Sequence, residues 1–350
     1  MKKINYVLNQ EQTKKRLMNS VKANIPCLVT SQPGVGKSAI IKQIAEELKL
    51  KLIDIRLTQV SQYDLNGLPA IEEGKSYYAP MNLFPLKGSK IPEGYEGWLI
   101  FLDEFMSADK FTQAAAYKLL LDRQIGEHDL HENVRILMAS NRATDGALVT
   151  KMNTAIQSRI THVEMEADYK VFTQYVAKEV EKGNWHPLVY GFINFMPKYI
   201  NNFDPAKEVT TYACPRTLEM LSKELKAGLL DLDYEIYMPA IAGIVGEAAA
   251  TDFCSFYATY GQLPDYKDII AKPATTPVPE QIAAKWALGA YLGEHIEEKD
   301  QDAVIEYVKR IEEDDLRVVI YRMIRSQAPY IGNNELLKED LVGIVRRNKK

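Results

Sequence analysis

Short apolar segments alternate with segments of helical periodicity along the first half of the chain. Continuous apolar runs such as 98–102 are typical of strands that are buried on both faces of a parallel sheet. The predicted strands are 26–30, 51–57, 98–102, 135–140 and 160–165. The predicted helices among them are 9–23, 39–48 and 111–121. Because parallel strands need helical crossovers, residues 1–167 predict an α/β domain of three layers, α/β/α, around a parallel sheet.

After Asp168 the pattern changes to helical periodicity alone. The predicted helices are 171–182, 187–195, 215–230, 236–260, 280–293, 300–327 and 334–347. A proline-rich segment at 272–279 indicates a connector between the earlier and the later helices. We therefore expect two further helical regions, at 168–232 and 233–350.

A glycine-rich loop connects the strand at 26–30 to the helix at 39–48 and ends in Gly36-Lys37-Ser38. Such glycines let the backbone turn tightly and point its N–H groups inward, while the helix presents the positive end of its dipole. A lysine there reaches the β- and γ-phosphates, and a serine hydroxyl ligates Mg²⁺. The residues predicted to bind ATP are Pro33, Gly34, Val35, Gly36, Lys37, Ser38 and Ala39. Ser31 stands where the usual pattern begins with glycine, and the alternative is a plain strand-to-helix turn.

Polar residues follow two of the buried strands: Asp103 and Glu104 come after 98–102, and Asn141 comes after 135–140. Ligands bind at the carboxyl ends of strands in open α/β sheets. We therefore predict that Asp103 holds Mg²⁺ or its water and that Glu104 polarises the water that attacks the γ-phosphate. The amide of Asn141 suits orienting that water. The alternatives are a solvated loop start for the two acids and a strand-ending turn for Asn141.

The order of these motifs resembles that of AAA+ ATPases, and the closest resemblance is to the MoxR-like branch. The segments that carry it are Gly34-Val35-Gly36-Lys37-Ser38, Phe101-Leu102-Asp103-Glu104, Ala139-Ser140-Asn141-Arg142, Asp64-Leu65-Asn66-Gly67-Leu68-Pro69, Tyr77-Tyr78-Ala79-Pro80 and Cys214-Pro215-Arg216-Thr217-Leu218-Glu219. The resemblance covers about residues 20–250. It implies an AAA+ core, a helical lid at 168–232, a C-terminal extension, and assembly into a ring that we expect to be a hexamer.

The resemblance also implies catalytic roles for two arginines. Arg159 is similar to the arginine finger that a neighbouring subunit inserts into the nucleotide site. Arg216 is similar to the lid arginine called sensor 2, which acts within its own subunit or across the interface. From the residues alone, Arg159 also fits a helix-ending charge and Arg216 a surface charge at a helix start. Because a finger supplied in trans is worth about 10³–10⁵ in rate, we expect an isolated monomer to hydrolyse ATP poorly.

Composition and charge limit the other classes of function. A net charge of −4 over 350 residues argues against a general nucleic-acid binder. Three widely separated cysteines indicate neither a zinc site nor a disulfide framework and favour a reducing compartment, so we expect a cytoplasmic protein. His128 and His131 fall in a predicted hairpin without metal-ligand spacing. We expect no membrane span, because no apolar run approaches ~20 residues.

A predicted hairpin within residues 60–82 protrudes from the core and carries Gly67, Gly74 and the pair Tyr77-Tyr78. The resemblance aims such a hairpin at the central channel of a ring, where it contacts a partner protein. The alternative is a long surface loop.

Three functions fit these observations. The first is an ATP-driven motor that remodels or activates a partner protein, and the resemblance implies a partner with a von Willebrand factor A domain. The second is an ATPase that acts on nucleic acid, as clamp loaders and helicases do, although no basic, aromatic-rich surface supports it. The third is a scaffold that binds ATP with little turnover.

Overall fold

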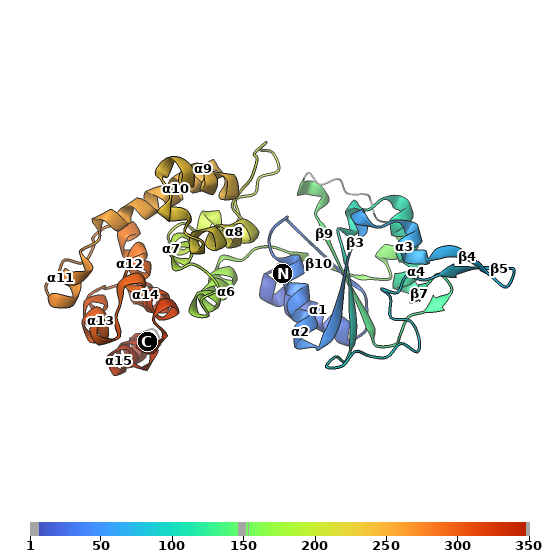
Figure 1. The fold of residues 1–350 in the computed structure, drawn as a ribbon, viewed down its shortest axis with the longest axis horizontal. Coiled ribbons are helices and arrows are strands. Elements are labelled where there is room, and N and C mark those ends of the chain that lie inside the picture. The colour runs from blue at the N-terminus through green and yellow to red at the C-terminus, as the bar shows by residue number, and fades with distance from the viewer. Residues whose placement is uncertain (1–6, 146–151, 153, 348–350) are drawn as a thin grey trace, which may run out of the picture. The chain divides into compact units, whose positions relative to one another are not determined.

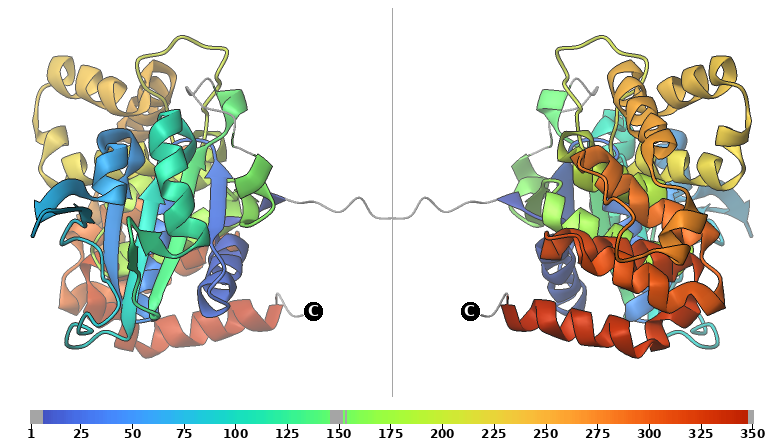
Figure 2. Two further views of the ribbon diagram at one scale, coloured as in Figure 1. Left: turned by 90° about the vertical axis from the view of Figure 1, so that its right-hand side faces the viewer. Right: turned by 90° about the vertical axis from the view of Figure 1, so that its left-hand side faces the viewer.

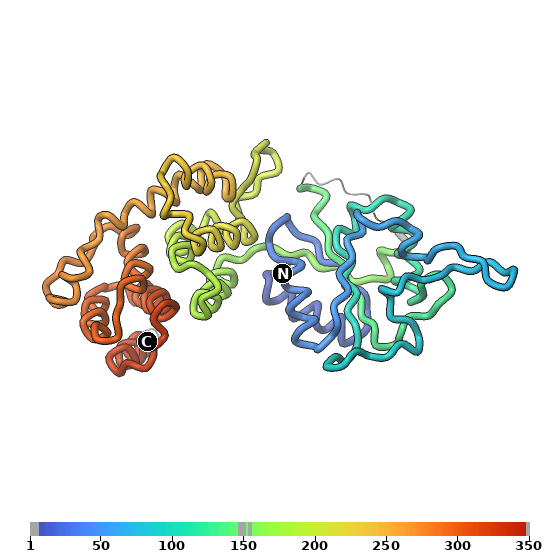
Figure 3. The backbone as a smooth tube through the Cα atoms, in the orientation of Figure 1, coloured from blue at the N-terminus to red at the C-terminus, as the bar shows by residue number. Residues whose placement is uncertain are grey.

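The computed structural model describes residues 7–145, 152 and 154–347, and the chain forms two compact units (Figure 3). The first unit extends to Asp168 and includes Asp204–Lys207. The second comprises Tyr169–Phe203 and the chain from Glu208 onward. The expected division of the helical half at 232/233 stays a prediction.

A six-stranded parallel sheet forms the centre of the first unit, in the order β1-β10-β2-β9-β6-β3. The strands are β1 (Val7–Leu8), β2 (Cys27–Ser31), β3 (Leu50–Arg56), β6 (Gly97–Asp103), β9 (Val134–Asn141) and β10 (Thr161–Met165). All five predicted strands are present, and the expected α/β class is confirmed. The two-residue strand β1 is an addition, because it is too short to give a periodic signal.

Alternate residues of each central strand face two different helical layers. On β6, Leu99 and Phe101 pack in one cluster with residues of α1 (Gln10–Lys22) and α2 (Lys37–Glu47). Ile100 and Leu102 pack in another cluster with α4 (Lys110–Leu121) on the opposite face (Figure 1). Burial on both faces explains why β6 is a continuous apolar run rather than an alternating one.

Two hairpins extend from this core. The antiparallel strands β4 (Leu68–Glu72) and β5 (Lys75–Ala79) follow the short helix α3 (Gln62–Asn66), and the hairpin projects away from the sheet (Figures 1 and 2). The second hairpin pairs β7 (Gln124–Ile125) with β8 (His128–Asp129). The sequence predicted both hairpins, the first from its glycines, and the structure contains both.

The second unit is helical throughout its regular structure. Its helices are α6 (Tyr169–Glu181), α7 (Pro187–Phe195), α8 (Pro215–Lys226), α9 (Tyr234–Val245), α10 (Glu247–Ala258), α11 (Tyr266–Ala271), α12 (Ile282–His295), α13 (Gln301–Lys309), α14 (Asp314–Gln327) and α15 (Glu335–Arg347). One apolar cluster joins residues of α6–α10 with residues of α12 and α14, and a second cluster lies among α11–α15. Within the described part of the chain, no helix is both long enough and apolar enough to cross a bilayer.

Two predicted helices are in fact interrupted. The predicted helix 236–260 breaks at Gly246, whose φ of 88° is unfavourable for other residues and whose added Cβ would lie 2.8 Å from the Thr211 carbonyl oxygen. The predicted helix 300–327 breaks between α13 and α14, where buried Ile311 turns into the core. Acidic residues then open α14, in agreement with the preference of helix N-termini for negative charge.

Candidate nucleotide-binding site

A loop between β2 and α2 provides an anion-binding surface made of backbone. Gly36 caps α2 with φ 101°, so no side chain covers the N–H groups of the first helical turn. Among the described residues, no atom lies within 4 Å of the point where a Cβ on Gly36 would stand. The open space in front of a positive helix terminus fits a phosphate group.

The Lys37 side chain lies across this loop and is only 9% exposed. Its ammonium donates to Ser31 Oγ at 2.9 Å, to the Gln32 carbonyl at 3.1 Å and to Asn141 Oδ1 at 2.9 Å. Ser31 stands where the usual pattern has glycine, and its hydroxyl therefore accepts a hydrogen bond directly from the lysine. The structure also brings Asn141 to the loop, because Ser31 and Asn141 are partners in the β2–β9 register.

Ser38 and Asp103 lie together at the same edge of the sheet. The Ser38 hydroxyl donates to Asp103 Oδ2 at 3.2 Å. Hydroxyl and carboxylate oxygens are the ligands that Mg²⁺ prefers, so the pair fits the predicted metal site. In the part of the chain that the structure describes, no group of three or more His, Cys, Asp or Glu residues has the arrangement of a metal site. A cation held here would depend on phosphate oxygens and water for its other ligands.

Glu104 follows in a left-handed conformation, with φ 56° and ψ 33°. This conformation is uncommon for a residue other than glycine and directs the side chain away from the line of the strand. The Glu104 carboxylate accepts a hydrogen bond from the Thr58 hydroxyl. Thr58 lies just beyond β3, and sequence reasoning missed it, because only the β3–β6 register brings this turn beside Glu104.

Negative charge gathers near Asp103. On the neighbouring strand β3, burial raises the pKa of Asp54, the Lys42 ammonium opposes that rise, and the Asp103 carboxylate adds to it. Crowded carboxylates favour a cation, because a positive charge between them removes their mutual repulsion.

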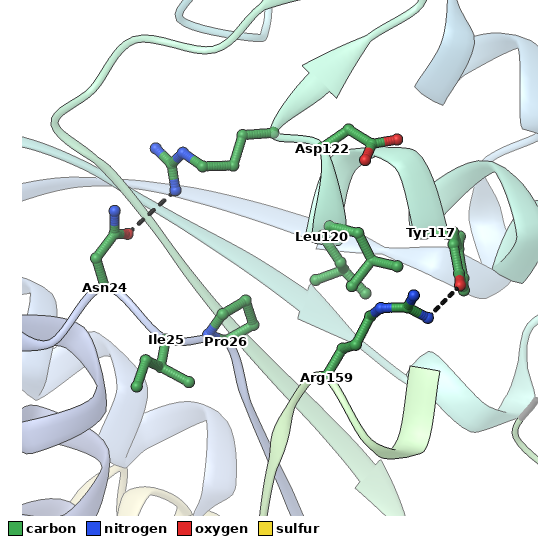
Figure 4. A pocket seen from close by; sticks show the side chains of 9 residues that line it. Asn24, Ile25, Pro26, Tyr117, Leu120, Asp122 and Arg159 are labelled. Carbon is green, nitrogen blue, oxygen red and sulfur yellow. Dashed lines mark hydrogen bonds between the residues drawn. The ribbon is translucent and has the colours of Figure 1, made fainter. Parts of the chain in front are cut away.

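Arg159 lies near the amino ends of the parallel strands, whereas the loop lies at their carboxyl ends. Arg159 precedes β10, whose Thr161 pairs with Cys27 at the start of β2, whereas Ser31 at the end of β2 pairs with Met165. Four strand residues at about 3.3 Å each separate these edges by roughly 13 Å. The exposed Arg159 side chain borders a pocket of about 500 Å³ and donates to the Tyr117 hydroxyl at 2.9 Å (Figure 4).

Two further arginines were considered from the sequence. Arg216 is exposed in the first turn of α8 in the second unit, and its catalytic role stays a prediction. Arg142, to which we assigned no role, pairs with Glu164 at 2.9 Å and with Glu166 at 3.3 Å. These ion pairs connect the end of β9 to β10 and give Arg142 a structural explanation.

The chain is similar to one protein-family model and, distantly, to solved structures. Residues 26–160 match the model of the AAA domain of the dynein-related subfamily. No curated protein sequence matches the chain. Two solved structures illustrate its structural neighbours. The RuvB Holliday junction branch migration motor of Thermotoga maritima is 19% identical with a TM-score of 0.37, and 82% of each chain is covered. NtrX of Brucella abortus in complex with ADP is 14% identical with a TM-score of 0.41, covering 98% of this chain and 70% of NtrX.

The family match spans the part of the chain that holds the loop, Asp103, Glu104, Asn141 and Arg159. The parallel sheet and the helices that cover both of its faces surround these residues. Residues 26–160 are therefore similar to the AAA domain, and the first unit has the parallel sheet and covering helices of the AAA+ P-loop fold.

Proposed function

We propose that this protein is an ATP-hydrolysing AAA+ motor of the MoxR-like kind. It assembles into a ring, which we take to be a hexamer, and it remodels or activates a partner protein in the cytoplasm. The observation that carries the proposal is the separation of two parts of one site: the phosphate loop lies at one edge of the sheet and Arg159 at the other.

Five side chains near the phosphate loop take part in the proposed hydrolysis. The N–H groups before α2 and the Lys37 ammonium bind the phosphates, and Lys37 exchanges some of its present oxygen contacts for phosphate oxygens. Ser38 and Asp103 hold Mg²⁺, which offsets charge on the phosphates when bound. Glu104 accepts a proton from the attacking water, and Asn141 orients that water.

Arg159 supplies the arginine finger that the residues near the loop do not provide. Because it lies roughly 13 Å along the strand direction from the loop of its own chain, it reaches a nucleotide only across an interface with another copy. In a closed ring every nucleotide site is completed in this way, because each subunit inserts its Arg159 into the site of one neighbour and its own site receives Arg159 from the other neighbour. The family resemblance implies a further role for Arg216 of the second unit as the lid arginine, within the subunit or across the interface.

Two variants test hydrolysis and assembly together. Glu104→Gln is expected to lower kcat at least about 100-fold while it still binds ATP, because the general base is lost. Its molecular mass in ATP, measured by light scattering, should be that of a ring. A monomer in ATP contradicts the ring, and equal turnover in the native protein and Glu104→Gln supports a scaffold in place of a motor.

The partner is identified with the same trapped variant. Glu104→Gln with ATP should retain the client from its source cell, and we expect a protein with a von Willebrand factor A domain among those retained. The native protein with ADP is the control. Strong stimulation of ATP hydrolysis by DNA at moderate salt, with no protein retained, would instead support an ATPase that acts on nucleic acid.

The β4–β5 hairpin is the surface that we propose contacts the partner. Its residues Leu68 and Ile71 are 60% and 80% exposed, which is unusual for large apolar side chains. Replacing Ile71 with Ser should reduce partner retention without changing basal ATP turnover. Unchanged retention would show that the hairpin is a plain surface loop.

A further inference from the structure

Six aromatic rings form a continuous chain of contacts in the second unit. They come from α9, from α10 and the turn that follows it, and from α12, helices that are labelled in Figure 1. Neighbouring ring centroids lie 4.6–6.2 Å apart. In the order of these contacts the residues are Tyr234, Tyr237, Tyr257, Tyr260, Tyr291 and His295, which we call the tyrosine strip. Each of them keeps part of its surface exposed, so the strip belongs to the surface of this unit.

The strip differs from the aromatic part of the core in the same unit. Phe192 contacts Phe253 at 5.2 Å and Phe256 at 5.9 Å between centroids, and all three residues are at most 1% exposed. A hydrocarbon ring suits such a buried place because it carries no polar atom that needs a partner. The rings of the strip carry hydroxyls at a partly wet surface, which is where tyrosines contact other molecules.

Carboxylates lie beside the strip. Burial, and after it the Glu294 and Asp231 carboxylates, raises the pKa of Tyr257. Burial is also the main cause of the raised pKa of Tyr237, to which Glu235 contributes. In the part of the chain that the structure describes, Glu294, Asp231 and Glu235 form no ion pair. Their charges are therefore left for another molecule.

The negative charge of the whole chain is concentrated in this region. Residues 231–300, which carry the strip, contain twelve Asp and Glu against four Lys and no Arg. This stretch thus has a formal net charge of −8, whereas the complete chain has −4. A cationic partner is attracted to such a surface, and an anionic one is repelled.

The Tyr260 hydroxyl gives a second, independent indication of a missing group. It is buried and has no hydrogen-bond partner among the described residues. Burial, and after it the Glu294 carboxylate, raises the pKa of Tyr260. The carboxylate and the hydroxyl are thus near each other without a shared donor. A guanidinium can supply one, because its N–H groups reach two oxygens at once.

We propose that the tyrosine strip, together with Asp231, Glu235 and Glu294, binds an arginine-rich segment of a partner protein. Guanidinium groups stack on tyrosine faces and pair with carboxylates through parallel hydrogen bonds. The rings of the strip hold one another in place, so little side-chain freedom is lost on binding. Nucleic acids and anionic lipids have the same sign of charge as this surface. The contact needs neither the nucleotide site nor ATP hydrolysis.

An oligoarginine peptide with a fluorescent label is the probe for this surface. Titrated with the full-length protein, its fluorescence anisotropy should show saturable binding. The affinity should fall at least about threefold between about 50 and 300 mM NaCl, because salt screens exposed charges. A labelled oligoglutamate peptide is the control and should not bind. Absence of oligoarginine binding at the lower salt, or tighter binding of a labelled DNA oligonucleotide, overturns the proposal.

Substitutions at the strip and in the first unit separate this surface from general charge effects. Glu294→Gln and Tyr234→Ser should each weaken oligoarginine binding about two- to fivefold, since each removes one ion pair or one cation–π contact. Tyr234 is 55% exposed and Gln is isosteric with Glu, so both variants should keep the native melting temperature. Glu93→Gln and Tyr95→Ser are the matched controls, because Glu93 is exposed and Tyr95 is 45% exposed in the first unit. Both controls should bind like the native protein.

Two results with these variants overturn the proposal. Equal weakening by all four substitutions would show that the peptide follows net charge alone. Native affinity in both Glu294→Gln and Tyr234→Ser would show that the peptide does not contact the strip. Neither result affects the proposed ATP hydrolysis, because none of the four substituted residues belongs to the nucleotide site.

Discussion

At the scale of single residues, the Thr58 hydroxyl fixes the orientation of the Glu104 carboxylate by donating a hydrogen bond to it. We predict that Thr58→Val lowers kcat about fivefold with little change in KM. The reason is that one hydrogen bond orients the carboxylate toward the attacking water, and such a bond is worth about 1 kcal/mol. Steady-state ATP turnover of the assembled protein measures the effect.

Thr58→Ser is the matched control for this change, because it keeps the hydroxyl and removes only a methyl group. Its kcat should stay near that of the native protein. If the Ser and Val variants turn over ATP at the same rate, the Thr58 hydroxyl has no role in hydrolysis.

Some of the site could be predicted from residues alone, and some could not. Lys37, Asp103 and Asn141 are recognisable because each follows a buried apolar run, where parallel strands share an edge. The hydroxyl of Ser31 appeared only as a departure from a pattern, whereas the structure makes it a ligand of Lys37. Thr58 gave no signal, since its relation to Glu104 depends on strand order, which periodicity does not contain.

At the scale of helices and turns, the break between α9 and α10 depends on Gly246. With φ 88° and ψ 154°, this residue occupies a region open essentially to glycine alone. A Cβ there would also lie 2.8 Å from the Thr211 carbonyl oxygen. We predict that Gly246→Ala lowers the free energy of unfolding by about 1–3 kcal/mol, measured by chemical denaturation.

Gly243 offers a control within α9. Its added Cβ would contact no described atom within 4 Å, and its backbone is helical. Gly243→Ala should therefore be neutral or stabilise the protein by up to about 1 kcal/mol, the difference in helix propensity. Equal destabilisation by the two substitutions would show that Gly246 has no special conformational role.

The start of α7 should make the second unit sensitive to acid. His186 caps α7, with Nδ1 accepting from the Leu188 N–H at 3.1 Å. Burial, with a smaller contribution from Lys226, lowers the pKa of His186 from its usual 6.5 to about 4. The unfolded chain therefore binds the proton more readily, so stability is complete above pH 6.5 and falls as the pH drops toward 4, by up to about 3 kcal/mol.

His186→Asn tests this pH dependence, because asparagine also caps helices but does not titrate in this range. Thermal unfolding between pH 7 and 4 should show a steeper loss of stability in the native protein than in the variant. Parallel pH profiles would show that another group causes the loss.

Periodicity predicted most elements of the fold but not their interruptions. The apolar runs of β2, β6 and β9 were visible because strands buried on both faces need uninterrupted apolar residues. The breaks at Gly246 and between α13 and α14 were missed. Local signals stood at both breaks, Gly246 at the first and the acidic residues that open α14 at the second, but a search for periodicity alone does not detect them.

At the scale of the whole molecule, the position of Arg159 is a consequence of topology. The sequence places it before a strand, and only the parallel β2–β10 register shows that this end of β10 is remote from the loop. The family resemblance implies the role, and the sheet places Arg159 roughly 13 Å along the strand direction from the loop of its own chain. We therefore expect hydrolysis to depend on assembled copies.

Mixing two inactive variants tests this behaviour directly. Glu104→Gln lacks the general base but keeps Arg159, and Arg159→Ala lacks the arginine but keeps Glu104. In a mixed ring, some interfaces join an intact Glu104 to an intact Arg159 from its neighbour. We predict that an equimolar mixture hydrolyses ATP at least about tenfold faster than either variant alone, since the arginine is worth about 10³–10⁵ in rate.

The gain should depend on exchange of subunits. It should disappear at protein concentrations below those at which the native assembly forms, because separated subunits cannot share a site. A mixture of Glu104→Gln with the double variant Glu104→Gln/Arg159→Ala contains no intact general base and is the control. A mixture no faster than the mean of its two components would show that Arg159 serves its own subunit or none, and the ring would then need another explanation than a shared active site.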